Sequence, residues 1–263
     1  MDPLAHWREL VQRPDGELPL DEAALVIAAH ATPSLDVAAQ LSRLDDVAAQ
    51  VGSADTEGVC AVLFGDLGLR GDERTYDDPR NSYLDQVLDR RLGIPISLSV
   101  LLIEVGRRCG LTLEGVGMPG HFLVRDVGSP DLLIDAFSGG RRLDHQDCRQ
   151  LLRAATRTPV DLDAGMLAPV GPRAIVARML ANLHNSFVRR ADRPGLAWVT
   201  RLRAGIPGLP MGNRMELATG LAGFGLYDEA ADLLETLASD PALDTEAAGK
   251  LRTRANGVRA NLN

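Results

Sequence analysis

Three features of the sequence could act together chemically: the helix start within residues 93–99, His121 and Asp135. The dipole of a helix N-terminus favours a thiolate, so many enzymes place a reactive cysteine there. A histidine from a neighbouring strand then deprotonates the cysteine, and an acid orients the histidine. The stretch GIPISLS (93–99) contains a proline and two serines but no cysteine. The pattern therefore indicates the frame of a nucleophilic site without its usual nucleophile.

The elements that would position these residues follow from the hydrophobic pattern. A helix is expected from Pro95 to Cys109, since proline is well tolerated at a first helical position. The period then changes, which predicts strands within LTLEGVGM (111–118), GHFLVRD (120–126) and DLLIDAF (131–137). If the last two strands pair with Asp135 opposite Leu123, the acid shares a face with His121; a slip of one residue would move it to the other face. The fold class expected is α+β, with this helix packed on an antiparallel sheet.

Helical segments flank this core. Residues 20–31 and 34–51 show helical periodicity, and a long polar loop over 65–82 precedes a further helix. After about residue 171 the chain is helical again, and it repeats when Pro207 is laid on Pro241, a shift of 34 residues that is the tetratricopeptide period. We therefore expect two domains, 1–165 and 166–263, the second formed by tetratricopeptide-like repeats.

Composition limits the classes of function. The 263 residues carry a net charge of −8, which argues against broad binding to nucleic acid or to an anionic membrane. No apolar run has the length of a membrane span, and the charged N-terminus does not resemble a signal peptide. Three cysteines show neither metal-ligand spacing nor an even disulfide framework. We expect a cytoplasmic protein with no metal and no cofactor.

The segment from YDDPRNSYLDQVLDRRLGIPISL to PGHFLVR, followed by LLIDAF, resembles the SirB1 family, whose core belongs to the transglutaminase-like superfamily. The resemblance implies a papain-like core and a Gly-x-Cys, His, Asp site. On this sequence Gly93, His121 and Asp135 match the pattern, while Pro95 stands at the cysteine position. Proline cannot act as a nucleophile, so the resemblance implies a defective or repurposed site.

Two serines could in principle replace the missing cysteine. Ser97 is a candidate nucleophile, although it lies about 200° around the helix from Pro95 and so points away from the cysteine's direction. Ser99 lies one turn beyond Pro95 on the same side, but deeper. A hydroxyl also needs stronger activation than a thiol. Cys109 stands at the wrong end of the helix, where the dipole opposes a thiolate. The candidate cleft is completed by loop residues that could line it or serve only in capping and loop closure: Tyr76, Arg80 and Asn81.

The functional expectation has two branches. The leading one is a non-catalytic pseudoenzyme, a binding or scaffold protein whose partner is a protein or peptide held by the old cleft or by the repeats. The alternative is a hydrolase or acyltransferase with a serine nucleophile and a His–Asp pair. Labelling by a serine-directed probe separates the two.

Overall fold

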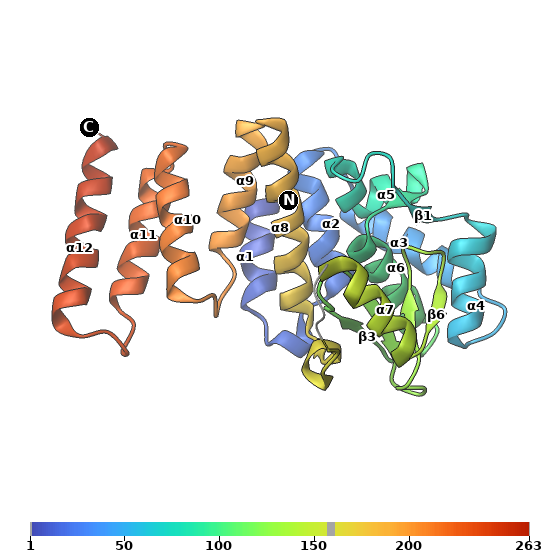
Figure 1. Cartoon of the computed structure of the whole chain (residues 1–263). Coiled ribbons are helices and arrows are strands. Elements are labelled where there is room, and N and C mark those ends of the chain that lie inside the picture. Colours follow the sequence, from blue (N-terminus) through green and yellow to red (C-terminus); the bar gives the residue numbers. More distant parts are fainter. Residues whose placement is uncertain (1, 157–160, 263) are drawn as a thin grey trace. The chain divides into compact units, whose positions relative to one another are not determined.

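The computed structural model describes residues 2–156 and 161–262, and the chain divides into two compact units, residues 1–183 and 184–263 (Figure 1). The division falls within α8 (Pro172–Arg190), whereas the sequence placed a boundary before this helix. The first part of α8 packs on the first unit: Ile175 is 2% exposed, and the Arg178 guanidinium lies 5.3 Å from the centre of the Phe122 ring.

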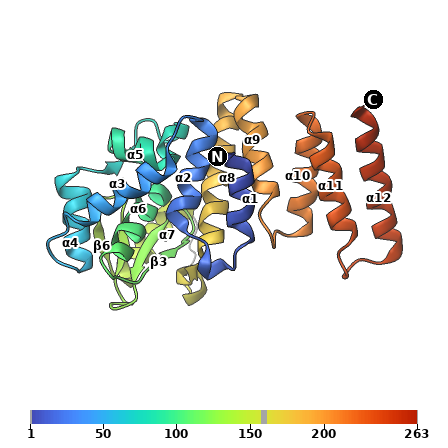
Figure 2. The same cartoon turned by 180° about the vertical axis from the view of Figure 1, so that it is seen from behind.

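The first unit is organised around α6 (Pro95–Arg108), in which every residue from Ile96 to Gly106 is buried. A helix that is apolar on nearly all sides must be covered on all sides. Helices α2 and α3 lie over one flank of α6, as Figure 2 shows, and the sheet lies against another. The remaining helices of the unit are α1 (Pro3–Gln12), α2 (Leu20–Ala31), α3 (Val37–Ala48), α4 (Thr56–Cys60), α5 (Leu84–Arg90) and α7 (His145–Thr156).

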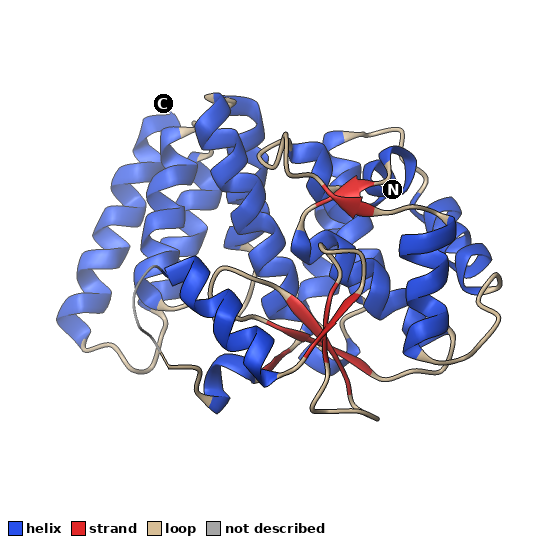
Figure 3. Cartoon of the chain, turned by 45° about the vertical axis from the view of Figure 1, so that its right-hand side comes forward, coloured by secondary structure: helices blue, strands red, loops and turns tan. Residues whose placement is uncertain are grey.

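A five-stranded sheet lies between α6 and α7, in the order β6-β5-β4-β3-β7, with antiparallel neighbours throughout (Figure 3). Its strands are β3 (Leu113–Val116), β4 (Leu123–Asp126), β5 (Leu133–Asp135), β6 (Arg141–Leu143) and β7 (Pro169–Val170). One face packs on α6, where Leu113 meets Gly106. The other face buries Leu123 and Leu133 against Leu152 of α7. The expected α+β fold, with a helix on an antiparallel sheet, is confirmed.

The register of the central hairpin is the one that the sequence allowed. Val124 pairs with Ile134 and Arg125 with Leu133, so the register continues with Asp135 opposite Leu123. A separate two-stranded parallel ladder joins β1 (Arg70–Gly71) to β2 (Leu92–Gly93), and it ties the loop over 65–82 to the start of α6.

The second unit consists of helices that follow one another by short turns. After the end of α8 come α9 (Arg193–Ala204), α10 (Met211–Gly223), α11 (Tyr227–Ala238) and α12 (Thr245–Arg259). The second pair begins at residues 227 and 245, each 34 residues after the corresponding helix of the first pair, so the predicted period recurs in the helices. The packed faces carry small residues such as Ala218, Ala231 and Ala255, which allow neighbouring helices to approach closely.

Candidate functional site

The start of α6 places Pro95 where the sequence predicted it. Ile94 is the N-cap residue and Pro95 the first helical residue, half-buried. Proline lacks a backbone donor, and the first turn of a helix has no acceptor for one. A glycine is required two residues earlier, because a Cβ on Gly93 would come within 2.9 Å of the Ser97 hydroxyl oxygen.

Ser97 is a capping residue, and this corrects its assignment as a candidate nucleophile. Its side chain is fully buried, and its Oγ accepts a hydrogen bond from the Ile94 N–H at 3.1 Å. The hydroxyl donates to the carbonyl oxygen of Asn81 at 2.6 Å. A nucleophilic hydroxyl must be open to substrate and next to a base. The Ser97 hydroxyl is closed to solvent and held by backbone groups, so it serves to join the loop to the helix.

Ser99 and the three cysteines also lack the features of an activated nucleophile. Ser99 is 0% exposed, and its Oγ has no hydrogen-bond partner in the part of the chain that the structure describes. Burial raises the pKa of both Cys60 and Cys148 to about 11, and it also raises the pKa of Cys109. A reactive cysteine has a lowered pKa. None of these groups therefore has the environment of an activated nucleophile.

The Asp135 carboxylate makes its hydrogen bonds within the turn that directly follows it. Its carboxylate accepts hydrogen bonds from the backbone N–H groups of Phe137 and Ser138, at 3.0 and 3.2 Å, and from the Ser138 hydroxyl at 2.7 Å. Among the described residues, no hydrogen bond or ion pair joins this carboxylate to the His121 imidazole. The expected His121–Asp135 contact is therefore not formed. The register explains the difference: His121 lies two residues before the partner of Asp135, and such diagonal neighbours are about 7–8 Å apart.

His121 itself lies at the end of a tight turn before β4. Gly120 has a φ of 79°, a left-handed conformation that favours glycine, and a Cβ there would come within 2.5 Å of the Ala155 Cβ on α7. The His121 carbonyl accepts a hydrogen bond from the Arg178 guanidinium at 3.0 Å. The imidazole is half-buried. Its backbone, then, is fixed by the sheet and by α8 rather than by Asp135.

Asn81, expected to line a cleft, is instead the centre of a buried polar network. Its Nδ2 donates to Asp72 at 3.1 Å and to the Thr75 carbonyl at 2.8 Å, and its Oδ1 accepts from Arg90 at 2.9 Å. Burial opposes ionisation of Asp72, yet hydrogen bonds from Thr75 and Asn81 hold the pKa of this carboxyl below its usual value. The network closes the loop onto α5 and α6. No role for Asp72, Thr75 or Arg90 was predicted from the sequence.

The two remaining loop residues are exposed. Arg80 makes a bidentate ion pair with the carboxylate of Asp78: its Nε donates at 3.0 Å and a terminal guanidinium nitrogen donates at 2.5 Å. Tyr76 is 47% exposed and packs edge to face against Phe137, with ring centres 6.1 Å apart. Phe137 follows Asp135, so this aromatic pair links the loop to the end of β5.

Within residues 2–156 and 161–262, no group of three His, Cys, Asp or Glu side chains gathers as a metal site. Within the same ranges, no helix has the length and apolar character required to cross a bilayer.

Comparison with known proteins decides the family. The model of the family described as "Transglutaminase-like superfamily" matches residues 30–181. This chain belongs to the transglutaminase-like superfamily. The matched part runs from His30 in α2 to Ala181 in α8 and includes α6 and the sheet. In this transglutaminase-like core the helix start is Pro95.

Several curated relatives are similar to parts of this chain. A "UPF0162 protein" of Xylella fastidiosa strain 9a5c is 41% identical over 202 residues, which cover 71% of this chain and 72% of the relative. "UPF0162 protein PA3419" of Pseudomonas aeruginosa is 38% identical over 172 residues, 62% of this chain and 63% of its own. Mouse "F-box only protein 21" is 34% identical over 131 residues, 46% of this chain and 20% of that protein. No solved structure matches the chain.

Proposed function

We propose that this chain is a non-catalytic binding protein built on a transglutaminase-like domain, of the kind that its resemblance to the SirB1 family implies. The observation that carries the proposal is the environment of α6. A proline stands where the superfamily has its nucleophile, and the next hydroxyl along the helix, that of Ser97, is fully buried in capping hydrogen bonds. The domain keeps the frame that would present a nucleophile but supplies none.

The second unit supports a partner of protein or peptide character. Its helices recur with a 34-residue period, and stacked helical pairs of this kind present concave surfaces to extended peptides. The net charge of −8 disfavours nucleic acid and anionic lipid as partners. We propose that the protein acts in the cytoplasm through these tetratricopeptide-like repeats.

The test uses an alkyl fluorophosphonate, which labels activated serines covalently and adds a defined mass. Wild-type protein, Ser97→Ala and Ser99→Ala are incubated with the probe and weighed intact, with an active serine hydrolase as positive control. The proposal predicts no adduct on the folded wild type. A stoichiometric adduct that disappears in Ser97→Ala or Ser99→Ala would show a serine enzyme and would refute the proposal.

A further inference from the structure

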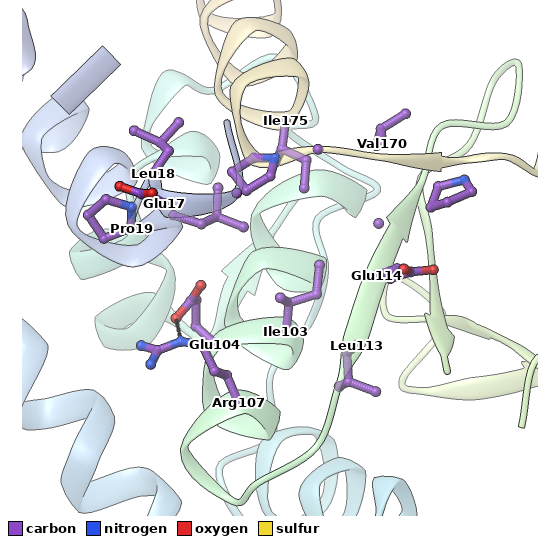
Figure 4. A pocket seen from close by; sticks show the side chains of 16 residues that line it. Glu17, Leu18, Pro19, Ile103, Glu104, Arg107, Leu113, Glu114, Val170 and Ile175 are labelled. Atoms are coloured by element: carbon purple, nitrogen blue, oxygen red, sulfur yellow. Dashed lines mark hydrogen bonds and ion pairs between the residues drawn. The ribbon is translucent and has the colours of Figure 1, made fainter. Parts of the chain in front are cut away.

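The first unit contains a cavity away from the start of α6. Its volume is about 580 Å³, within the range of roughly 300–1,000 Å³ that small-molecule sites occupy. Figure 4 shows apolar side chains around it from four elements. They are Leu18 on the segment before α2, Ile103 on α6, Leu113 on β3 and Ile175 on α8. The walls therefore suit an apolar body.

A carboxyl group lies at one end of this cavity. Glu104 lines it, although only 3% of the residue is exposed. Its Oε2 accepts hydrogen bonds from Arg107 Nε at 2.8 Å and from Arg108 at 3.3 Å. In the described part of the chain, neither guanidinium hydrogen-bonds Oε1. Burial of a charge is costly unless it is paired, and here the two guanidiniums supply the pairing through one of the two carboxylate oxygens.

The charges around the cavity are unbalanced. Both guanidiniums are also bonded to Asp21, at 3.1 Å from Arg107 and 2.8 Å from Arg108. Arg108 further binds Asp45 at 2.6 Å, and Glu17 lies on the exposed rim. Three carboxylates, those of Glu104, Asp21 and Asp45, thus share two guanidiniums, whose donors are largely taken. Glu114 of β3 is also among the residues that line the cavity (Figure 4). The local field favours a positively charged group.

We propose that this cavity binds a small organic cation, with its ammonium or amidinium group at Glu104 and its apolar body against Ile103, Leu113 and Ile175. The site is separate from the start of the helix, because nine residues of helix place Glu104 about 13 Å along the axis from Pro95. The proposal therefore holds whether or not the helix start has any chemistry.

Binding should depend on pH through Glu104. Burial, followed by the negative charge of Asp21, raises the pKa of Glu104 to about 7, while Arg107 opposes the shift. The groups that face it are Asp21 from α2 and Arg107 and Arg108 from its own helix, with Asp45 of α3 behind Arg108. A bound cation favours the ionised carboxylate. Affinity for a cation should rise with pH across the region of pH 7, and binding should release a proton.

The experiment compares three probes that share one apolar body: phenylbutylamine, phenylbutanol and phenylbutanoate. Their dissociation constants for the full chain are measured by NMR titration at about pH 8, where Glu104 is mostly ionised. We expect the cation to bind on the order of tenfold more tightly than the alcohol, as a charge-assisted hydrogen bond implies. The anion should bind most weakly.

Variants locate the site. Glu104→Gln keeps the shape and removes the charge, so it should bring the affinity for the cation to within about twofold of that for the alcohol. Glu246→Gln changes the net charge equally on exposed α12 and should alter neither affinity. Val170→Trp places a bulky ring on the cavity wall, at the edge strand, and should abolish binding of both probes without removing a charge.

Three outcomes would overturn the proposal. They are equal affinity of the wild type for the cation and the alcohol, tighter binding of the anion, and no binding of any probe at millimolar concentration. Cation binding that persists unchanged in Val170→Trp would place the ligand elsewhere and would also refute it. None of these results bears on whether Ser97 reacts with a fluorophosphonate.

Discussion

Ser97 and Ser99 form a natural matched pair, and their replacement by alanine should have different consequences. Both side chains are 0% exposed on the same helix. Only Ser97 is bonded: it accepts from the Ile94 N–H and donates to the Asn81 carbonyl. Loss of a side-chain cap costs about 0.5–2 kcal/mol, and a buried partner left without its hydrogen bond costs about 1–3 kcal/mol. We expect Ser97→Ala to lower the free energy of unfolding by about 2 kcal/mol.

Ser99→Ala should behave differently because the Ser99 hydroxyl has no hydrogen-bond partner among the described residues. Removing an unpartnered buried hydroxyl relieves its desolvation penalty, which offsets the loss of a few contacts. We therefore expect a change in the free energy of unfolding of within about 0.5 kcal/mol.

The assay is urea denaturation followed by the fluorescence of Trp7, which is 0% exposed in the first unit. The sequence has two tryptophans, so a Trp198→Phe background makes Trp7 the sole reporter. Equal losses for Ser97→Ala and Ser99→Ala would refute the reasoning. So would a loss below about 0.5 kcal/mol for Ser97→Ala, because the capping interpretation requires a larger one.

Two further predictions use the same reporter. Because the pKa of Glu104 in the folded state is about 7, above the ordinary value of 4.5, the folded state holds the proton more tightly. The contribution of this group to stability therefore falls as pH rises between those values. The difference in free energy of unfolding between the wild type and Glu104→Gln should therefore decrease as pH rises, by no more than about 1.4 kcal/mol per pH unit. A difference that stays constant or increases with pH would contradict this prediction. Gly71→Ala should lower the free energy of unfolding by about 1–3 kcal/mol, since its Cβ would come within 2.5 Å of the Phe137 ring. Gly65→Ala, with open space at the Cβ, is the control, and equal effects of the two would be inconsistent with the packing described.

The frame of the site was predictable because it depends on local patterns. The apolar run after Pro95 predicts a buried helix, and the change to alternation after Gly110 predicts strands. The register of the hairpin was allowed by its short turn and is confirmed by the pairing of Val124 with Ile134. Each of these features follows from hydrophobic periodicity and turn chemistry.

The contacts inside the site were not predictable, because each polar side chain has several possible hydrogen-bond partners and the sequence does not show which of them it takes. Asp135 satisfies its carboxylate within its own turn, through Phe137 and Ser138, before His121 can reach it. Ser97 stands at the third helical position, where a side chain commonly caps the backbone, and this was a signal that the sequence offered. Glu104 was a second such signal. It stands within an apolar run, and Arg107 and Arg108 follow it at three and four positions, the spacing of ion pairs on one helix face.

The most direct test of the central claim is to restore a nucleophile at Pro95 and measure its ionisation. Pro95→Cys is made in a Cys60→Ala, Cys109→Ala background, in which buried Cys148 stays unreactive, and the rate of alkylation by iodoacetamide is followed against pH. If α6 begins at a vacated nucleophile position, the helix N-terminus should lower the pKa of the new thiol below the ordinary value of about 8.5. Asp135→Asn should not change it, because the Asp135 carboxylate is bonded within its own turn. A thiol pKa at or above about 8.5 would contradict the account, since the start of α6 would then lack the environment that activates a nucleophile.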